Sequence, residues 1–267
     1  MISDNVITNN VGASLSLMCS HHNIVINNTV YEEVSGIFLA SSTCNFIVAN
    51  RVYSNHESCG IGLAYSSNNT VEDNWLTGNY QGISLGYSPL NILKDNIILN
   101  SSYAGIGVSD FSPNNLVVGN TVSNNQVGIK IIGSNYSLFY HNSFINNVNN
   151  HYAAMEYYPI NFWNNSFGEG NYWSNYTGID SDGDGVGDTP HPLYIYNQDY
   201  HPLMSPYIPG DCNHDGIVNI ADAAKIGIAW NTTKGMPAYN PHADLNMDNA
   251  INMADAEIIR KNWQKHV

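Results

Sequence analysis

The first 150 residues repeat one pattern of apolar and polar positions with a period of 22 to 24 residues. One column of the repeat is a glycine followed by aliphatic residues in alternate positions, and it occurs at Gly12, Gly36, Gly60, Gly82, Gly105 and Gly128. A second column is an asparagine with apolar residues three positions before and two positions after it, and it occurs at Asn5, Asn28, Asn50, Asn74, Asn96, Asn120 and Asn142. Each repeat therefore predicts three short strands separated by polar turns.

Strands this short cannot bury their apolar faces within one repeat. Successive repeats that stack share one continuous interior, so the pattern predicts a mainly β fold, a right-handed parallel β-helix. A leucine-rich-repeat horseshoe is the rival, but the repeats lack its leucine spacing and any helical half. The asparagine column has two explanations. Stacked amides about 4.8 Å apart can hydrogen-bond along the helix, or each asparagine adopts a left-handed turn conformation.

The repeat ends near Asn146. The aromatic and glycine-rich segment 161–178 predicts an irregular last coil that closes the apolar interior. An acidic loop follows, with carboxylates at relative positions 1, 3, 5 and 9 and the carbonyl of Val186 at position 7; the carboxylates belong to Asp180, Asp182, Asp184 and Asp188. Oxygen ligands at this density predict a calcium site, and a solvated acidic turn is the alternative. Segment 189–209 contains five prolines and is expected to run extended along the cap into a linker.

The carboxy-terminal region contains two twelve-residue loops that begin 33 residues apart. Side-chain oxygens stand at positions 1, 3, 5, 9 and 12 of each loop, and position 7 offers a backbone carbonyl, which is the ligand pattern of a calcium loop. The first loop supplies Asp211, Asn213, Asp215, Ile217, Asn219 and Asp222, and the second supplies Asp244, Asn246, Asp248, Ala250, Asn252 and Asp255. Asn249 replaces the glycine of the sharp turn, because asparagine tolerates the left-handed conformation.

Each of these loops leads into a predicted amphipathic helix, over residues 220–230 and 253–263. Ile226 and Trp230 of the first align with Ile259 and Trp263 of the second, so the two helices are expected to pack through these residues. We therefore divide the chain into a β-helix over residues 1–207 and a calcium-binding domain over residues 208–267.

Two resemblances follow from these motifs. The coils, with G-N-Y-W-S-N-Y-T-G-I-D-S-D-G-D-G-V-G-D-T-P and N-Q-D-Y-H-P-L-M, resemble NosD-like, carbohydrate-binding and sugar-hydrolase-type β-helices of archaeal cell-surface proteins. That resemblance implies an extracellular or cell-surface protein with polysaccharide as the usual ligand. The paired loop-helix units resemble a type I dockerin, which implies a cohesin domain on a scaffold or surface protein as the partner.

This sequence differs from the dockerin family at the residues that contact cohesin. Well-studied members carry small hydroxyl residues at loop positions 10 and 11, whereas this chain has Ile220 and Ala221 in one loop and Met253 and Ala254 in the other. The calcium role therefore carries over and the partner specificity does not. An apolar pair at these positions could instead dock on the chain's own β-helix.

The charge balance narrows the choice of partners. With 8 basic and 22 acidic residues the formal net charge is −14, which argues against nucleic acid and anionic membranes. No run of 18 apolar residues predicts a membrane span. The first residues already match the middle of a coil, so we expect an uncapped amino-terminal coil whose edges allow self-association. The cysteines, expected as free buried thiols with a Cys44–Cys59 bridge conceivable, are Cys19, Cys44, Cys59 and Cys212.

Two hypotheses for function remain. The first is a non-catalytic surface protein whose β-helix contacts polysaccharide and whose dockerin attaches it to a partner. The second is a dockerin-borne polysaccharide hydrolase or lyase, with stacked Asp73 and Asp95 as the candidate catalytic pair. A solvent-facing ion pair with Lys94 is the plainer interpretation of these carboxylates. The scarcity of basic residues in the first 209 residues favours the first hypothesis.

Histidines and aromatic residues give further leads. Met18, Cys19, His21 and His22 could bind a soft metal, but they lie in a predicted turn where polar residues are expected anyway. Copper is part of the NosD name, and the sequence shows no constellation of copper ligands. His141 and His151 are expected at the surface or in the cap. The 18 tyrosines and five tryptophans could stack on sugar rings, although most of the tryptophans are assigned to the cap and the dockerin core.

Overall fold

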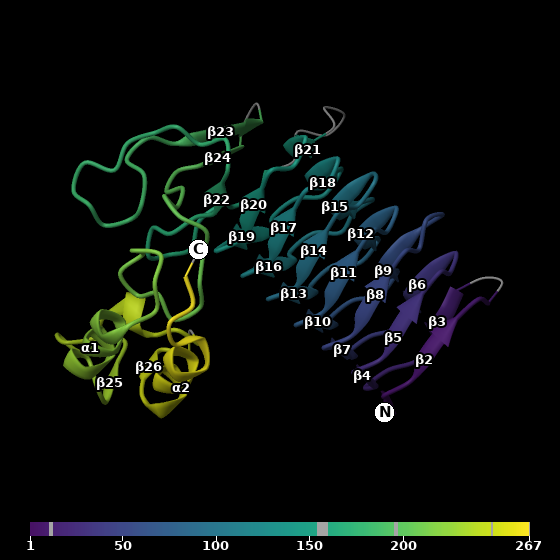
Figure 1. The fold of residues 1–267 in the computed structure, drawn as a ribbon, viewed down its shortest axis with the longest axis horizontal. Coiled ribbons are helices and arrows are strands. Elements are labelled where there is room, and N and C mark those ends of the chain that lie inside the picture. Colours follow the sequence, from purple (N-terminus) through teal and green to yellow (C-terminus); the bar gives the residue numbers. More distant parts are fainter. Residues whose placement is uncertain (11–12, 154–159, 195–196, 247, 267) are drawn as a thin grey trace.

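The computed structural model describes residues 1–10, 13–153, 160–194, 197–246 and 248–266. Its repeats form a parallel β-helix, and two short α-helices lie beyond its carboxy-terminal end (Figure 1). The first repeat glycine predicted from the sequence, Gly12, lies outside the described residues. None of the helices in the described residues has the length and hydrophobicity that a membrane-spanning helix requires.

Each coil contributes one strand to each of three parallel sheets. The first sheet contains β1 (Ile2–Ser3), β4 (Ile24–Ile26), β7 (Phe46–Val48), β10 (Thr70–Glu72), β13 (Ile92–Lys94), β16 (Leu116–Val118) and β19 (Leu138–Tyr140). The second contains β2 (Val6–Thr8), β5 (Thr29–Tyr31), β8 (Arg51–Tyr53), β11 (Trp75–Thr77), β14 (Ile97–Leu99), β17 (Thr121–Ser123), β20 (Ser143–Ile145) and β22 (Tyr172–Trp173). The third contains β3 (Ala13–Met18), β6 (Ser35–Ala40), β9 (Cys59–Ala64), β12 (Gln81–Gly86), β15 (Ala104–Ser109), β18 (Val127–Ile132) and β21 (Asn149–Ala153).

The interior is filled by the apolar columns that the sequence predicts. Residues on either side of the repeated asparagine are fully buried in the central coils, for example Val71 and Leu76. The glycine column is explained by close packing rather than by a left-handed backbone. A Cβ added at Gly82 would lie 2.3 Å from Ile98 Cγ2, and one at Gly105 would lie 2.5 Å from Val122 Cγ1. Only glycine therefore lets the chain pass this close to the aliphatic core.

The asparagine column forms a hydrogen-bonded ladder, which decides between the two explanations of it. Asn74 Oδ1 accepts hydrogen bonds from the backbone N–H and the side-chain amide of Asn50, at 2.9 and 3.0 Å. Asn74 Nδ2 donates to Asn96 Oδ1 in the next coil at 3.0 Å. The left-handed conformation belongs instead to the preceding residue, as at Asp73 and Asp95 with φ of 55° and 53°.

Two further ladders were not predicted from the sequence. One runs beside the first sheet and contains Asn23, Asn45, Asn69, Asn91 and Asn115. Another joins Asn55 to Asn79 and Asn125 to Asn147. A row of serine hydroxyls accepts backbone N–H groups from one coil to the next, at Ser42, Ser66, Ser88, Ser112 and Ser134. Each turn of the β-helix is therefore bonded to its neighbours through buried polar side chains as well as through its strands.

Aromatic residues close the carboxy-terminal end of the interior, as predicted. Trp163 stacks on Phe139 with ring centroids 4.5 Å apart, and Trp173 stacks on Phe144 at 4.4 Å. Both tryptophans are buried. The stacked aliphatic core therefore ends against two indole rings instead of against water.

The proline-rich segment after the cap contains a hairpin that the sequence did not predict. β23 (His191–Tyr194) pairs antiparallel with β24 (Asn197–Asp199). Asn197 Oδ1 accepts the N–H of Asn161 at 3.0 Å, and Asp199 Oδ2 accepts the N–H of Asn171 at 2.7 Å. These two side chains end two of the asparagine ladders. Burial raises the pKa of Asp199 to about 6, although the hydrogen bond from Trp173 opposes that rise.

The carboxy-terminal region folds around its own small core. It contains α1 (Ile220–Ile228), β25 (Thr232–Thr233), the 3₁₀ helix η2 (Pro241–Ala243), β26 (Ala250–Ile251) and α2 (Met253–Asn262). Ile226 and Ile259 are buried in this core, as predicted. The prediction that Trp230 and Trp263 pack beside them is wrong, because both helices end before these residues and the two residues are 39% and 46% exposed.

The ladder makes a strong prediction for stability. Replacing Asn74 with alanine leaves buried N–H and carbonyl groups of two coils without partners, each of which costs free energy. We expect Asn74→Ala to lower the free energy of unfolding by about 3 kcal/mol and the Tm by roughly 6–12 °C in calorimetry. Asn68→Gly is the control, because Asn68 is exposed with φ of 56°, a conformation that glycine accepts. Equal Tm values for the two variants would contradict a structural role for the ladder.

Candidate functional site

The first twelve-residue loop folds its own backbone around its acidic side chains. Asp211 accepts hydrogen bonds from the N–H groups of Asp215 and Gly216, at 3.2 and 2.9 Å. Asp215 in turn accepts the N–H of Ile217 at 3.0 Å. The closing residue, Asp222, is fully buried and accepts the N–H of Cys212 at 2.8 Å. The loop thus buries the carboxylates of Asp211 and Asp222, whereas Asp215 is exposed.

The second loop repeats this scheme residue by residue. Asp244 accepts from Asp248 and Asn249 at 3.1 and 2.9 Å, and buried Asp255 accepts from Leu245 at 2.8 Å. Asn249 has φ of 68°, which confirms that asparagine takes the left-handed place of Gly216, whose φ is 84°. Two separate stretches of sequence therefore reach one geometry.

Position 9 and position 12 of both loops also begin the helices. Asn219 and Asp222 form a capping box at the start of α1, and Asn252 and Asp255 form the same box at the start of α2. A side chain fixed by a cap loses little further entropy when it binds an ion. The residues at positions 9 and 12 therefore both begin the helix and complete the predicted ion site.

The acidic loop over residues 180–188 folds in the same way. Asp180 accepts from Gly183 and Gly185 at 2.7 and 2.9 Å, and Asp184 accepts from Val186 at 2.8 Å. Gly185 has φ of 85°, which matches the sixth residue of the other loops. The hydrogen bond from Gly185 holds the pKa of Asp180 below its usual value. Ligand atoms of Asp180, Asp182 and Asp184 all lie within 4.8 Å of one another.

The donor set of these three loops fits calcium. Carboxylate, amide and carbonyl oxygens are the ligands that Ca²⁺ prefers, and each loop concentrates them on one turn. Burial raises the pKa of Asp211, and the nearby charges of Asp222 and Asp215 add to the rise while the Gly216 hydrogen bond opposes it. A bound cation would offset this crowding of negative charge.

The third loop lies against the first. His214, in the first loop, directs Nδ1 toward the carbonyl oxygen of Asp184 at 3.4 Å. His214 also reaches Glu169 in the β-helix cap, 3.3 Å from Oε1. The sequence singled out neither residue, because they are distant in the chain and neither stands at a ligand position of the predicted calcium loops.

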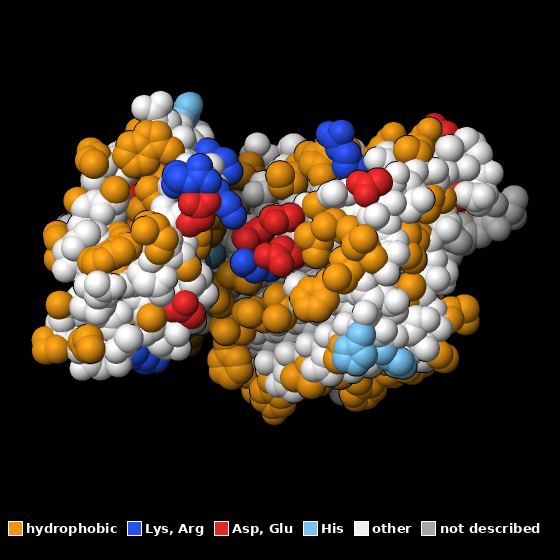
Figure 2. Space-filling model, turned by 90° about the horizontal axis from the view of Figure 1, so that it is seen from below, with side chains coloured by type: hydrophobic (Ala, Val, Ile, Leu, Met, Phe, Trp, Pro, Cys, Tyr) orange, Lys and Arg blue, Asp and Glu red, His pale blue; other side chains and the backbone are white. Residues whose placement is uncertain are grey.

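The acidic residues on the side of the β-helix form an ion-paired patch. Lys94 Nζ lies 3.1 Å from Glu72 and 3.5 Å from Asp95. This arrangement agrees with the plainer interpretation of Asp73 and Asp95. Figure 2 shows acidic side chains on the β-helix beside a group of basic side chains across the junction. Burial raises the pKa of Asp73, and the positive charges of Lys261, in the last turn of α2, and of Lys265, beyond its end, oppose that rise.

Comparison with known proteins identifies both parts of the chain. The family described as periplasmic copper-binding protein (NosD) matches residues 1–178. The chain belongs to the NosD family. The type I dockerin domain matches residues 209–262, so this NosD-family chain has a modular organisation, a β-helix followed by a dockerin. No curated protein matches the sequence.

Two solved structures illustrate the neighbours of this NosD-family β-helix. The periplasmic alginate epimerase AlgG has a TM-score of 0.49 at 20% identity, over 59% of this chain and 42% of that one. The A-module of the mannuronan C-5 epimerase AlgE6 from Azotobacter vinelandii has a TM-score of 0.41 at 14% identity, over 60% of this chain and 55% of that one. The chain therefore spans about half the length of these structures.

The other sequence candidates of this NosD-family chain do not converge on a site. Met18 and Cys19 are exposed, and His21 Nδ1 bonds to Thr43 Oγ1 at 2.8 Å. Among the described residues, the clusters able to hold a metal do not include them. All four cysteines are free, so Cys44 and Cys59 form no bridge, and only Cys59 and Cys212 are buried. His141 is buried and bonds to Glu169 of the cap at 2.8 Å, so of the two expected positions, surface or cap, it takes the cap.

The patch on the β-helix predicts a dependence of stability on pH. Burial raises the pKa of Asp95 to about 6; Lys94 opposes the rise and Asp73 adds to it. The folded state therefore binds this proton more tightly than the unfolded chain, and stability falls as the pH rises from about 4 to about 6. We expect Asp95→Asn to raise stability at pH 7 by about 1 kcal/mol after solvent screening, or roughly 2–4 °C in Tm.

The gain from Asp95→Asn should vanish at pH 4, where the wild-type side chain is protonated in the folded state. Thermal melts at both pH values measure it. Asp110→Asn is the matched control, because Asp110 is exposed and has a similar φ of 50°. A gain that persists unchanged at pH 4 would exclude the buried charge as its cause.

Proposed function

We propose that this NosD-family protein is an extracellular or cell-surface protein whose β-helix is attached to a partner protein by a calcium-dependent dockerin. The observation that carries the proposal is the identical hydrogen-bond scheme in the loops that begin at Asp211 and Asp244. A fold that turns carboxylates inward twice, in the same way, is organised for a cation. The proposed domains span residues 1–207 and 208–267.

Each proposed calcium ion has a defined ligand set. The first dockerin ion is held by Asp211, Asn213, Asp215, the carbonyl of Ile217, Asn219 and Asp222. The second is held by Asp244, Asn246, Asp248, the carbonyl of Ala250, Asn252 and Asp255. A third ion is held by Asp180, Asp182, Asp184, the carbonyl of Val186 and Asp188. The third loop has His191 where the other loops have the closing aspartate, so we expect its ion to bind more weakly.

Calcium removal should destabilise the dockerin domain. Ions that bind only the folded chain stabilise it by about 2.7 kcal/mol per site at 100 times Kd, so chelation should lower the Tm by roughly 5–10 °C. We expect equilibrium dialysis to find three ions in the wild type. Asp182→Ala should lose the third ion alone, whereas Asp215→Ala should lose one dockerin ion.

The exposed Asp110→Asn variant is the control for charge, and it should retain three ions. A Tm that does not change when chelator is added to the full chain would remove the calcium proposal. Loss of ions from Asp110→Asn would show nonspecific binding to the acidic surface instead of occupation of the loops.

The start of each dockerin helix offers the proposed partner surface. Ile220 and Met253 stand at the same loop position, and 72% and 69% of their surfaces are exposed. The alternative that this apolar pair docks on the chain's own β-helix is therefore wrong. Exposed aliphatic side chains at both repeats fit an apolar contact on a cohesin-type module of a scaffold or surface protein.

Partner binding can be tested with these two residues. Immobilised protein should retain a cohesin-type module in calcium and release it in chelator. The double change Ile220→Lys and Met253→Lys should weaken binding by about 30-fold or more, as expected for the loss of a central apolar contact. Ile228→Lys is the control, because Ile228 is equally apolar and exposed at the far end of α1. Equal loss in both variants would contradict the proposed surface.

The β-helix offers a surface for polysaccharide along its length. Tyr65, Tyr87 and Phe111 are exposed and lie in successive coils, and the first two rings stack with centroids 4.8 Å apart. Because the rings cover one another's faces, a glycan chain would contact their edges along the row instead of stacking on each ring.

The amino-terminal coil offers a surface for self-association. There β1, β2 and β3 are the edge strands of the three sheets, and pairing between such edges is the proposed route to self-association.

A further inference from the structure

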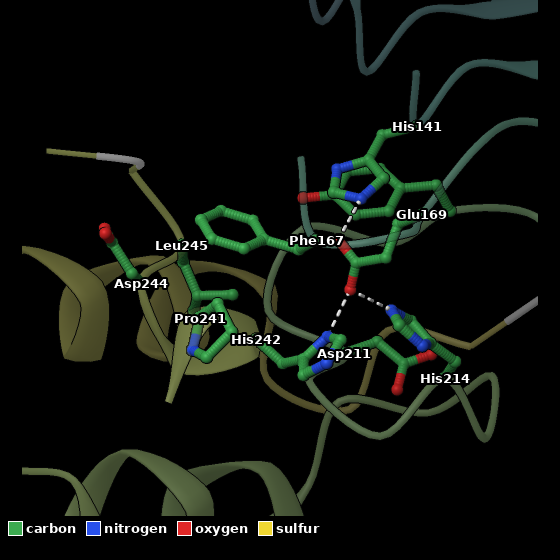
Figure 3. A pocket seen from close by; sticks show the side chains of 10 residues that line it. His141, Phe167, Glu169, Asp211, His214, Pro241, His242, Asp244 and Leu245 are labelled. Carbon is green, nitrogen blue, oxygen red and sulfur yellow. Dashed lines mark hydrogen bonds and ion pairs between the residues drawn. The ribbon is translucent and has the colours of Figure 1, made fainter. Parts of the chain in front are cut away.

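Four titratable side chains from distant parts of the chain meet where the cap contacts the dockerin (Figure 3). Glu169 comes from the cap, His141 from the last regular coil, His214 from the first calcium loop and His242 from η2. Glu169 and His141 are buried, and His214 is 10% exposed. None of the four belongs to the three oxygen ligand sets.

One carboxylate oxygen of Glu169 faces two imidazole nitrogens. His214 Nε2 lies 3.3 Å from Glu169 Oε1, and His242 Nδ1 contacts the same oxygen. The other oxygen, Oε2, is held by His141 Nε2 and Asn165 Nδ2, each at 2.8 Å. His141 and Asn165 therefore fix the orientation of the Glu169 carboxylate. Its Oε1 atom points at the two histidines of the dockerin.

One nitrogen of His214, Nε2, lacks a hydrogen-bond donor in this arrangement. A backbone carbonyl can only accept, so Nδ1 of His214 must donate to Asp184. In the neutral ring Nε2 then carries a lone pair, and this lone pair faces a carboxylate oxygen. Two acceptors do not bond to each other, so a cation or a proton is needed between them.

We propose that Glu169, His214 and His242 bind a zinc ion that joins the β-helix cap to the dockerin. The three ligand atoms lie within 4.8 Å of one another. Bonds of about 2.1 Å in a tetrahedral site place ligand atoms about 3.4 Å apart, which agrees with the 3.3 Å between His214 Nε2 and Glu169 Oε1. His242 Nδ1 lies closer to that oxygen and must move back to make room for the ion. The adjoining cavity of about 20 Å³ has room for one water as the fourth ligand.

The surroundings of the cluster match those of zinc sites in general. Metal-bound histidines donate their second N–H to a backbone carbonyl, as His214 does to Asp184. Ligating carboxylates are themselves hydrogen-bonded, as Glu169 is by His141. Two imidazoles and one carboxylate suit zinc, whereas calcium prefers oxygen alone. The ion is therefore distinct from those proposed for the acidic loops.

The test is zinc binding by the full chain, prepared without a histidine tag and kept in saturating calcium. Calorimetric titration with zinc chloride should show one zinc ion per chain, with calcium content unchanged. Cobalt(II) should produce the visible absorption of a tetrahedral nitrogen and oxygen site at the same stoichiometry.

Two variants and one control locate the ion. His242→Ala removes a partly exposed ligand, and Glu169→Gln keeps the shape of the carboxylate while weakening its affinity. Loss of a residue that only hydrogen-bonds to a metal ligand lowers metal affinity by about 10- to 100-fold. These variants change direct ligands, so each should weaken zinc binding by more than about 100-fold. His56→Ala removes an exposed histidine of the β-helix and should bind zinc as the wild type does.

Each outcome decides the proposal. Selective loss of zinc in His242→Ala and Glu169→Gln, with normal binding by His56→Ala, supports it. Absence of zinc uptake by the wild type overturns it and leaves a proton between His214 and Glu169. Zinc that displaces calcium, or that binds equally to all variants, also overturns it. Because calcium is measured in the same samples, failure of the zinc site is distinguishable from failure of the dockerin proposal.

Discussion

Stacked amide hydrogen bonds are the constraint on which this structure depends. A β-helix turns three times per coil, and each turn buries backbone groups that no strand partner satisfies. The asparagine at each turn solves this by accepting from the coil before it and donating to the coil after it, as Asn74 does between Asn50 and Asn96. The aliphatic columns supply the hydrophobic free energy, but the amides fix the register at which those columns meet.

The ends of a ladder need partners as much as its middle. β24 provides them at the carboxy-terminal end, where Asn197 and Asp199 accept the last ladder N–H groups and the indole N–H groups of Trp163 and Trp173. The ladders therefore end in the cap with their hydrogen bonds satisfied. The dockerin contacts the cap where His214 and His242 meet Glu169, and the basic residues of the dockerin face the acidic side of the β-helix (Figure 2).

Periodicity and local motifs carried most of the information that the sequence could give. The columns around Val71 and Leu76 predicted which residues are buried, because a repeated unit places equivalent residues in equivalent environments. The acidic loops were also predictable, since their acidic and amide residues lie within twelve consecutive residues and Asn249 could be recognised as a glycine substitute. The second and third asparagine ladders could have been found from the same period, the second at Asn45, Asn69 and Asn91 and the third at Asn55, Asn79 and Asn125.

Contacts between distant segments required the tertiary structure. Glu169, His214 and His242 have no common spacing, and only the seating of the dockerin on the cap brings them together. The same holds for Trp230 and Trp263, whose alignment predicted burial, whereas the length of the two helices leaves them at the surface. The repeating interior and the acidic loops follow from the order of residues alone, because they depend on near neighbours or on a fixed period. The junction was decided by the fold alone, because it depends on how two unrelated surfaces meet.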